Sequence, residues 1–383
     1  MTLAFPSAPP DLSLQSHHSD ADWLNLTWLD GQTSRYPTVW LRDNVPSGRH
    51  RLGGQRTFDI IATPQALCLA GVELVGEDSI ALTFQPEGLS EVFSLAWLRA
   101  HRLSQSGSAA PQRRHLWDQS LQARIPQADF TRISTDDRAL CACLKAVWEK
   151  GLTIVHGVPT VPQQLFAVVA LFGYVRETNY GRLFDVKTVE KPTNLAFTSM
   201  KLGLHTDNPY RDPVPGLQLL HCLEASAQGG ETLLCDGFYV AEKLRRDAPE
   251  AFALLTRWPV PFRFQDEDSD LQSRAPLIEL SSTGEIEAVR YNNRSAAPLD
   301  LPVDVMADYY WAYRLFGEAL HDPRAAVAYQ LQPGDLLLFD NRRVLHARGK
   351  VGAGRRHLQG CYADMDGLRS KLSCLEAQAE ARR

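Results

Sequence analysis

Two histidines and one aspartate of this chain have the types and spacing of a metal site. His205 and Asp207 are two positions apart, and on an extended chain such residues point to the same side. A lone His-x-Asp pair is also typical of a surface turn. Here, however, a second apolar run at residues 336–339 leads to His346. Two histidines and one carboxylate form the facial triad of non-haem Fe(II) oxygenases, so the sequence predicts an iron site at His205, Asp207 and His346.

An arginine and a threonine near these residues can bind a carboxylate. Arg356 follows His346 by ten positions, and its guanidinium can make two parallel hydrogen bonds that a lysine cannot reproduce. Thr232, in the segment GGETLLCDGF, offers a hydroxyl to the same group. The open positions of a facial triad accept an oxidant and a keto-acid, so we expect these two residues beside the metal.

The composition is that of a globular protein with a small-molecule partner. The 383 residues are 44% hydrophobic and 22% charged, and the net charge of -5 argues against nucleic acid as a partner. No apolar stretch approaches the ~20 residues that span a bilayer, and the N-terminus lacks a signal-peptide pattern, so we expect no membrane partner and a cytoplasmic location. The seven cysteines are scattered, which indicates reduced thiols. The pair Cys141 and Cys143 lies in an amphipathic helical pattern, and we interpret it as core rather than as a metal site.

Two structural units must position these groups. Residues 20–100 contain short alternating segments such as LNLTWLDG, YPTVWLRDN, FDIIA and GVELVGEDSIALTF, which predict a small antiparallel β domain over 1–104. We expect a linker over 105–130, where the chain is first polar and rich in small residues. From 131 to 383 helical patterns alternate with β-like runs, without a Gly-rich phosphate loop. A β-barrel with flanking helices fits this pattern better than a doubly wound nucleotide-binding fold.

The order of these motifs resembles the taurine dioxygenase-like superfamily, and most closely γ-butyrobetaine hydroxylase and trimethyllysine dioxygenase. The segments that carry the resemblance are TVWLRDN, ETNYGRLFDV, LHTDNP, GLQLLHC, GGETLLCDGF, FDNRRVLHAR and RRHLQGCYAD. The resemblance implies a mainly β fold with flanking helices, in which a double-stranded β-helix (jelly-roll) catalytic domain follows the small N-terminal β domain. It further implies a non-haem Fe(II) hydroxylase with 2-oxoglutarate and O2 as cosubstrates, stimulation by ascorbate, and a homodimer. Arg356 and Thr232 would hold 2-oxoglutarate, with Arg355 as the alternative arginine.

The N-terminal unit departs from the family in one respect. In γ-butyrobetaine hydroxylases the segment after LRDN carries cysteines that help to hold a structural zinc, whereas this chain has Val-Pro-Ser-Gly-Arg-His at 45–50. A zinc site of this kind needs four such ligands. We therefore expect that the N-terminal zinc site has been lost.

The resemblance also places substrate-binding residues. A trimethylammonium group cannot donate hydrogen bonds and is best held by aromatic faces. The family's cation cage falls on four aromatic residues: Tyr180, Phe184, Phe197 and Tyr362. The family's carboxylate-binding amides fall on Asn194 and Asn293, while Arg294 and Asn208 offer further donors to the anionic end of the substrate. The alternative for Arg294 is that it faces a buried carboxylate or solvent.

These residues leave two substrates open. Arg294 beside Asn293 favours a dianionic phosphonate, 2-(trimethylammonio)ethylphosphonate, hydroxylated at the carbon that bears phosphorus. That carbon lies two bonds from nitrogen, as does the carbon that is hydroxylated in γ-butyrobetaine. The phosphonate is the preferred substrate on this reasoning, γ-butyrobetaine is the alternative, and a barrel that has lost turnover is the alternative of a different class.

Overall fold

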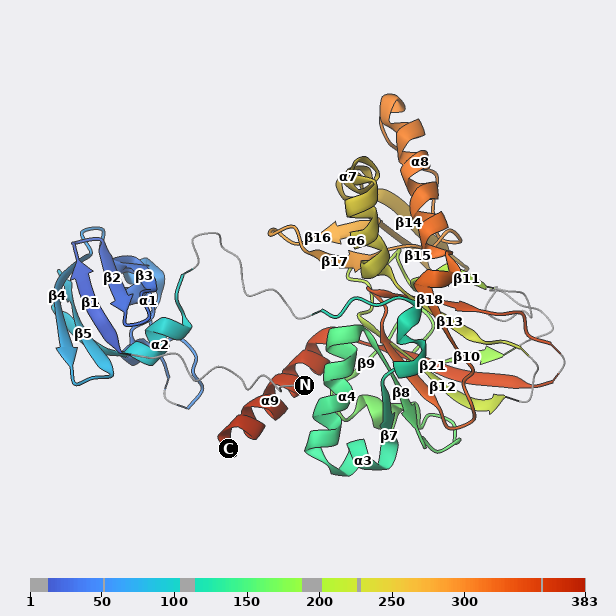
Figure 1. Ribbon diagram of the computed structural model, residues 1–383, viewed down its shortest axis with the longest axis horizontal. Coiled ribbons are helices and arrows are strands. Elements are labelled where there is room, and N and C mark those ends of the chain that lie inside the picture. The colour runs from blue at the N-terminus through green and yellow to red at the C-terminus, as the bar shows by residue number, and fades with distance from the viewer. Residues whose placement is uncertain are drawn as a thin grey trace. The chain divides into compact units, whose positions relative to one another are not determined.

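The chain divides into two compact units, residues 1–111 and 112–383 (Figure 1). The computed structural model describes residues 13–50, 52–103, 114–187, 202–225, 229–352 and 354–382. Both units are built on β-sheets, and the predicted fold class is confirmed. No helix among the described residues is long and apolar enough to cross a membrane.

The first unit consists of two three-stranded antiparallel sheets. Leu24, Leu26 and Trp28 alternate with more exposed residues along one strand and are fully buried, as are Ile80 and Phe84 in the second sheet. This period of two predicted the unit from the sequence. Its elements are β1 (Leu14–Ser19), β2 (Trp23–Trp28), β3 (Thr33–Pro37), α1 (Thr38–Asp43), short 3-10 turns at Pro46–Gly48 and Ile60–Ala62, β4 (Cys68–Val75), β5 (Ser79–Gln85), β6 (Leu89–Ser94) and α2 (Leu95–Ala100).

The second unit contains two larger sheets, the major and the minor sheet of a jelly roll. The major sheet has the order β10-β21-β12-β19-β8-β7, with β9 also paired to β21, and the minor sheet has the order β11-β20-β13-β18. All these pairs are antiparallel except β7 with β8. The strands of the major sheet are β7 (Gln127–Asp129), β8 (Leu152–His156), β9 (Val175–Arg176), β10 (Phe184–Lys187), β12 (Leu217–Ala225), β19 (Leu336–Asp340) and β21 (Arg356–Ala363). Those of the minor sheet are β11 (Leu202–His205), β13 (Thr232–Asp236), β18 (Ala326–Tyr329) and β20 (Val344–Arg348).

Apolar side chains on both faces of the major sheet form two separate cores. On β19, Leu337 and Phe339 join the core between the two sheets, whereas Leu336 and Leu338 join the core under the helices. All four are at most 1% exposed. A strand that is covered on both faces needs an unbroken apolar run, which explains the sequence LLLF at this position.

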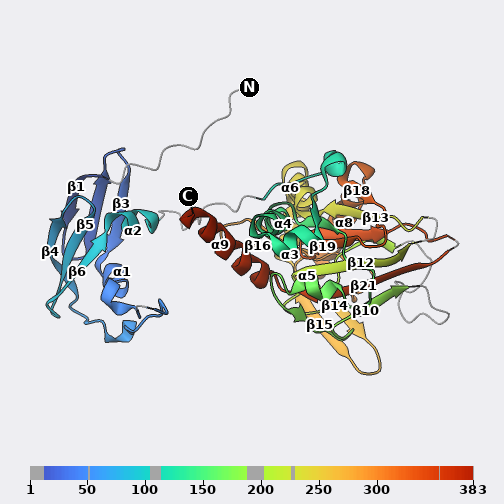
Figure 2. The same cartoon turned by 90° about the horizontal axis from the view of Figure 1, so that it is seen from below.

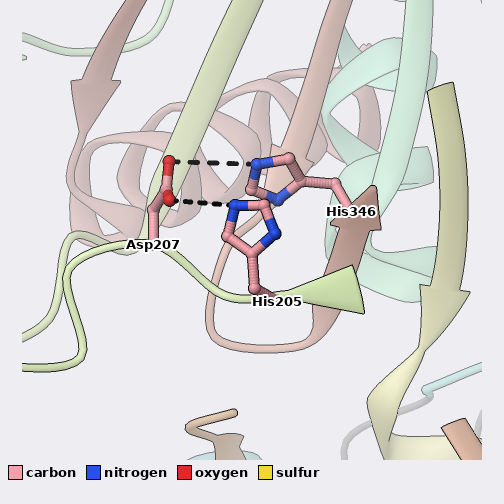
Figure 3. Close-up of side chains that lie close together, drawn as sticks. All are labelled: His205, Asp207 and His346. Carbon is pink, nitrogen blue, oxygen red and sulfur yellow. Dashed lines mark ion pairs between the residues drawn. The ribbon is translucent and has the colours of Figure 1, made fainter. Parts of the chain in front are cut away.

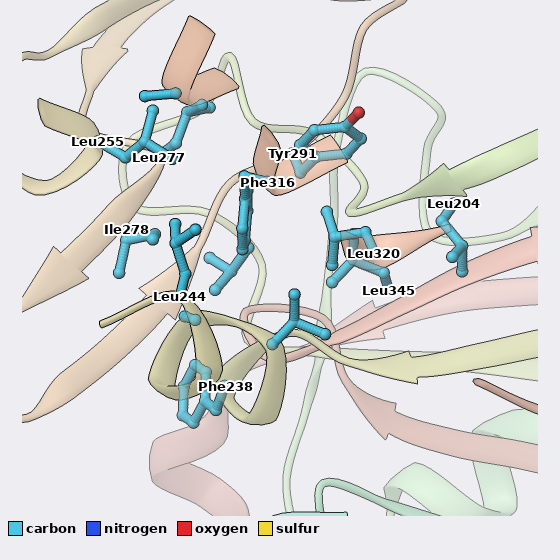
Figure 4. Close-up of a cluster of buried hydrophobic side chains, with 14 of the residues drawn as sticks. Leu204, Phe238, Leu244, Leu255, Leu277, Ile278, Tyr291, Phe316, Leu320 and Leu345 are labelled. Atoms are coloured by element: carbon cyan, nitrogen blue, oxygen red, sulfur yellow. The ribbon is translucent and has the colours of Figure 1, made fainter. Parts of the chain in front are cut away.

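Helices cover the outer face of each sheet (Figures 1 and 2). Those against the major sheet are α3 (Phe130–Thr135), α4 (Asp137–Lys150), α5 (Leu165–Val169) and α9 (Met365–Ala381). Those against the minor sheet are α6 (Gly237–Asp247), α7 (Pro249–Arg257) and α8 (Val303–Leu320), together with the hairpins β14 (Val260–Gln265)–β15 (Asp270–Ala275) and β16 (Ile278–Leu280)–β17 (Ile286–Val289). In this second group Phe238, Leu244 and Phe316 pack against Leu345 of the minor sheet (Figure 4).

Residues 114–130 belong to the second unit, although we expected a linker as far as 130. Trp117, Leu121 and Ile125 are buried in the core between the two sheets. The Trp117 backbone N–H also donates to the carboxylate of Asp236 at 3.1 Å. The polar composition that indicated a linker ends at about residue 113, and the apolar residues after it are widely spaced, so the sequence pattern did not reveal their burial.

Two local predictions in the first unit were wrong. The segment YPTVWLRDN was expected to be extended, but residues Thr38–Asp43 form α1 and bury Thr38, Leu41 and Arg42. The segment FDIIA forms a 3-10 turn at Ile60–Ala62. Short apolar runs do not distinguish a strand from a short helix by periodicity alone.

Candidate active site

The predicted metal ligands converge at one edge of the minor sheet (Figure 3). His205 on β11 lies directly opposite His346 on β20 in the antiparallel register. The two ring centroids are 4.2 Å apart. His205 Nε2 lies 3.3 Å from Asp207 Oδ1, and His346 Nε2 lies 3.9 Å from Asp207 Oδ2. The structure therefore brings His346, which is distant in sequence, beside the neighbouring pair His205 and Asp207, with all candidate ligand atoms within 4.8 Å of one another.

The protonation states of these residues suit a divalent cation. His205 Nδ1 lies 2.8 Å from the carbonyl oxygen of Gly203, which can only accept, so Nδ1 carries a proton and Nε2 is the ring nitrogen that faces Asp207. Burial, together with the charge of His205, lowers the pKa of His346 to about 3, which leaves this imidazole neutral. Burial opposes ionisation of Asp207, but its hydrogen bond to His205 and the charges around it hold its pKa well below the usual range.

The donor set therefore fits Fe(II). Two imidazole nitrogens and one carboxylate converge without a fourth His, Cys, Asp or Glu ligand among the described residues. This is the set that leaves coordination positions open for other ligands. His205, Asp207 and His346 are the residues that would hold the ion.

Asp207 is held by a residue that the sequence analysis missed. The side chain of Asn341 accepts from the Asp207 backbone N–H at 2.8 Å and donates to the Asp207 carbonyl oxygen at 3.0 Å. Asn341 is fully buried in the turn between β19 and β20. Its position five residues before His346, in the segment FDNRRVLH, was the available signal.

A cavity beside the triad contains the residues that were predicted to bind 2-oxoglutarate. Thr232 and Arg356 both line it. Burial, with a smaller contribution from the charge of Arg348, lowers the pKa of Arg356 to about 10. Arg355 does not line the cavity: its side chain is 83% exposed and lies 4.0 Å from Glu224. The geometry thus favours Arg356 over Arg355.

Arg348 is a second arginine of this cavity that the sequence analysis missed. It lies on β20 two residues after His346, and its register partner on β13 is Thr232. Residues two apart on a strand share a face, which was the available signal. Arg348 and Arg356 make this end of the cavity positive.

Aromatic residues form another wall of the same cavity. Tyr180, Phe184 and Tyr362 line it as predicted, with centroid distances of 6.2 Å between Tyr180 and Phe184 and 5.2 Å between Phe184 and Tyr362. Phe184 lies opposite Gly360, where a Cβ atom would be only 2.3 Å from the ring. Phe197 and Asn194 lie outside the described residues. Glycine at position 360 therefore makes room for one wall of the cavity.

Two further aromatic residues extend this wall and were missed by the sequence analysis. Tyr210 and Phe264 line the cavity and stack at a centroid distance of 5.2 Å. Phe264 also meets the edge of Tyr180 at 5.8 Å, and the hydroxyls of Tyr180 and Tyr210 are 3.1 Å apart. Phe264 lies on the β14–β15 hairpin, and no local motif marks it.

The structure places only some of the polar residues that were predicted for the anionic end at the cavity. Asn208 and Arg294 line the cavity, and Asn208 Nδ2 has no hydrogen-bond partner among the described residues. Asn293 does not line it, because its side chain faces Tyr291 and accepts from the hydroxyl of Tyr313. Asn292 lines the cavity instead, and its amide donates to the carbonyl oxygen of Thr206 at 3.0 Å. Asn292 rather than Asn293 is thus the amide that lines the cavity.

Comparisons with known proteins agree with this site. Residues 112–362 match the taurine catabolism dioxygenase TauD, TfdA family, and residues 15–99 match the γ-butyrobetaine hydroxylase-like N-terminal family. The chain is 39% identical to the γ-butyrobetaine dioxygenase of Pseudomonas sp. (strain AK-1), over 97% of this chain and 98% of the relative. It is 30% identical to human γ-butyrobetaine dioxygenase, over 94% of this chain and 96% of the relative.

The chain also has more distant similarities. The trimethyllysine dioxygenase of Meyerozyma guilliermondii is 29% identical over 93% of this chain and 94% of its own length. A solved structure of a putative α-ketoglutarate-dependent taurine dioxygenase from Burkholderia xenovorans aligns with 62% of this chain and 88% of its own, at 15% identity and a TM-score of 0.49. The curated relatives confirm the family resemblance, but they do not support the phosphonate branch.

Proposed function

The chain belongs to the taurine catabolism dioxygenase TauD, TfdA family, and on this premise we propose that it hydroxylates γ-butyrobetaine. As a member of this family it is a non-haem, Fe(II)- and 2-oxoglutarate-dependent dioxygenase. The observation that carries the proposal is the similarity, along nearly the whole chain, to a γ-butyrobetaine dioxygenase, combined with an aromatic cavity beside the His-Asp-His triad.

The aromatic wall supports a cationic substrate. The rings of Tyr180, Phe184 and Tyr362 face the same cavity as Tyr210 and Phe264. Aromatic faces attract a quaternary ammonium group by roughly 0.5–2 kcal/mol per contact, depending on how far the site is desolvated. A sulfonate such as taurine has a primary ammonium group that can donate hydrogen bonds, so it would not need such a wall.

The anionic end supports a carboxylate substrate. Asn208 and Asn292 offer amide groups at the cavity, and Arg294 adds a positive charge. Arg294 was the main argument for a phosphonate. Its charge is equally suited to a carboxylate, and the curated relatives named above favour the alternative, γ-butyrobetaine. We therefore replace the phosphonate by γ-butyrobetaine as the preferred substrate.

The residues that line the cavity have separate roles in the proposed reaction. Bound Fe(II) would supply the activation of O2 that is coupled to decarboxylation of 2-oxoglutarate. Arg356 and Thr232 orient the cosubstrate through its distal carboxylate, and the aromatic wall orients the cation. Fixing both ends of the substrate presents the carbon two bonds from nitrogen to the metal, so positioning decides which C–H bond reacts.

A substrate panel tests this proposal. The full chain is incubated with Fe(II), 2-oxoglutarate and O2, together with γ-butyrobetaine, trimethyllysine, 2-(trimethylammonio)ethylphosphonate or taurine. Succinate is measured for each, and product mass is measured for the gain of one oxygen. We expect the fastest coupled turnover with γ-butyrobetaine and none with His346→Ala. Faster turnover of the phosphonate or of taurine, or no turnover with any compound, would reject the proposal.

A further inference from the structure

The two carboxylate oxygens of Asp207 have different surroundings. Oδ2 accepts a hydrogen bond from Gln218 Nε2 at 2.8 Å and another from the Tyr362 hydroxyl at 3.0 Å. Oδ1 is the oxygen that faces His205 Nε2, at 3.3 Å (Figure 3). Oδ2 is thus engaged by two protein donors and lies 3.9 Å from His346 Nε2, whereas Oδ1 lies closer to its histidine, at 3.3 Å from His205 Nε2.

The sheet register delivers both donors to the same point. Gln218 on β12 and Tyr362 on β21 are direct partners in the antiparallel pairing. Their chain neighbours Leu217 and Leu219, and Cys361 and Ala363, are in the core under the helices. Because side chains alternate along a strand, Gln218 and Tyr362 must point the other way, into the cavity. Both line the cavity and are at most 3% exposed, so water does not replace them easily.

The chemistry of the two groups matches this placement. An amide NH2 group can only donate, and a carboxylate can only accept, so both bonds have a defined direction. Hydrogen bonds to an ionised acceptor are roughly twice as strong as neutral ones. The ring of Tyr362 lies in the aromatic wall beside Phe184, but phenylalanine would supply that ring equally well. The contact to Asp207 therefore gives the hydroxyl a role of its own.

We propose that Gln218 and Tyr362 are positioning residues for the metal: by engaging Asp207 Oδ2 they leave Oδ1 as the single carboxylate ligand atom. A carboxylate that used both oxygens on the ion would have to give up at least one of these two hydrogen bonds, because each oxygen has two lone pairs. It would also occupy a coordination position that the facial triad leaves open for other ligands. Groups that orient a metal ligand from behind typically change metal affinity by about 10- to 100-fold when they are removed.

Metal binding in the absence of substrate tests this role. The variants Tyr362→Phe, Gln218→Met and the double variant keep side-chain size and remove one or both donors. Mn(II) is titrated into the metal-free full chain, and the free ion is followed by electron paramagnetic resonance. We expect about tenfold weaker binding in each single variant, and a loss of up to about 100-fold in the double variant.

Tyr309→Phe is the matched control. Tyr309 is a fully buried tyrosine of α8 whose hydroxyl has no hydrogen-bond partner among the described residues. If the Tyr362 hydroxyl only supported the fold, Tyr362→Phe would lower the unfolding temperature of the metal-free chain and leave Mn(II) affinity unchanged. We expect instead that the rise in unfolding temperature on adding Mn(II) shrinks in Tyr362→Phe but not in Tyr309→Phe.

The coordination itself provides a second readout. The d–d absorption bands of bound Co(II) lose intensity as the coordination number rises. We expect weaker bands in the double variant, because both oxygens of Asp207 then become available. Mn(II) affinity and Co(II) spectra like those of the wild type in a folded double variant would overturn the proposal. So would an equal loss of affinity in Tyr309→Phe.

Discussion

The side chain of Asn341 holds Asp207 by both of its backbone polar groups, the N–H at 2.8 Å and the carbonyl oxygen at 3.0 Å. The same amide donates to the carbonyl oxygen of Pro215 at 3.1 Å. Asn341 thus ties the loop that carries Asp207 to the turn that precedes His346. The geometry of the triad depends on this link between two distant parts of the chain.

Replacing Asn341 should weaken both the fold and metal binding. Asn341→Ala leaves buried backbone groups of Asp207 and Pro215 without partners, at a cost of about 1–3 kcal/mol per group. We expect a loss of about 2–4 kcal/mol in the free energy of unfolding by urea, with weaker Mn(II) binding. Asn25→Ala, in the first unit, is the control and should change neither quantity. Unchanged Mn(II) affinity in a folded Asn341→Ala variant would contradict the link.

Arg356 and Arg355 should behave differently toward 2-oxoglutarate. Removing a buried, hydrogen-bonded charge partner costs about 2–5 kcal/mol, so Arg356→Ala should raise the KM for 2-oxoglutarate at least about 30-fold. The KM for γ-butyrobetaine should change much less. Arg355→Ala should resemble the wild type because that side chain is 83% exposed. An equal rise in both KM values for Arg356→Ala would place this residue in the substrate site instead.

Phe264 should recognise the charge of the substrate rather than its bulk. Phe264→Leu keeps an apolar side chain but loses the aromatic face, and the cation contact is worth roughly 0.5–2 kcal/mol. We expect the KM for γ-butyrobetaine to rise about 2- to 30-fold. The competitor 5,5-dimethylhexanoate has the same shape without the positive charge, and its inhibition constant should hardly change. A parallel change for both compounds would mean that Phe264 contributes only packing.

The buried ion pair between Arg343 and Asp236 should contribute strongly to stability. Nη2 of Arg343 lies 2.8 Å from the Asp236 carboxylate, and the two side chains are 2% and 0% exposed. Arg343→Met leaves a buried carboxylate without its charge partner, which typically costs about 3–5 kcal/mol. Arg314→Met, which breaks an exposed pair with Glu318, should change the free energy of unfolding by less than about 1 kcal/mol. Similar urea midpoints for the two variants would contradict this account.

Stability should fall at alkaline pH in part because of Cys143. Burial raises the pKa of its thiol to about 12, whereas an unfolded cysteine titrates near 8.5. Above about pH 8.5 the unfolded chain loses this proton first, so the stabilisation is complete below pH 8.5 and is lost as pH rises toward 12. Between pH 8 and pH 10 the wild type should lose about 2 kcal/mol more of its free energy of unfolding than Cys143→Ala. Replacing the exposed Cys374 by alanine should leave the wild-type pH dependence unchanged.

The sequence alone determined the features that depend on local spacing. His205 and Asp207 share a side because they are two residues apart, and the apolar run before His346, with turn residues on both sides, favours a buried strand. The small N-terminal β domain was predicted from short alternating segments. The order of these motifs also identified the family before any geometry was known.

Only the tertiary structure decided which distant side chains meet. The register of β12 against β21 places Gln218 beside Tyr362, and the β14–β15 hairpin brings Phe264 to Tyr180. Because neighbouring side chains of an extended chain point to opposite sides, only one of Arg355 and Arg356 can point into the cavity. Packing decides that this residue is Arg356. That Asn292 rather than Asn293 lines the cavity likewise depends on tertiary contacts, among them the hydrogen bond from the Asn292 amide to the carbonyl oxygen of Thr206. These relations come from pairing and burial between segments far apart in the chain, and local periodicity carries no information about such pairing.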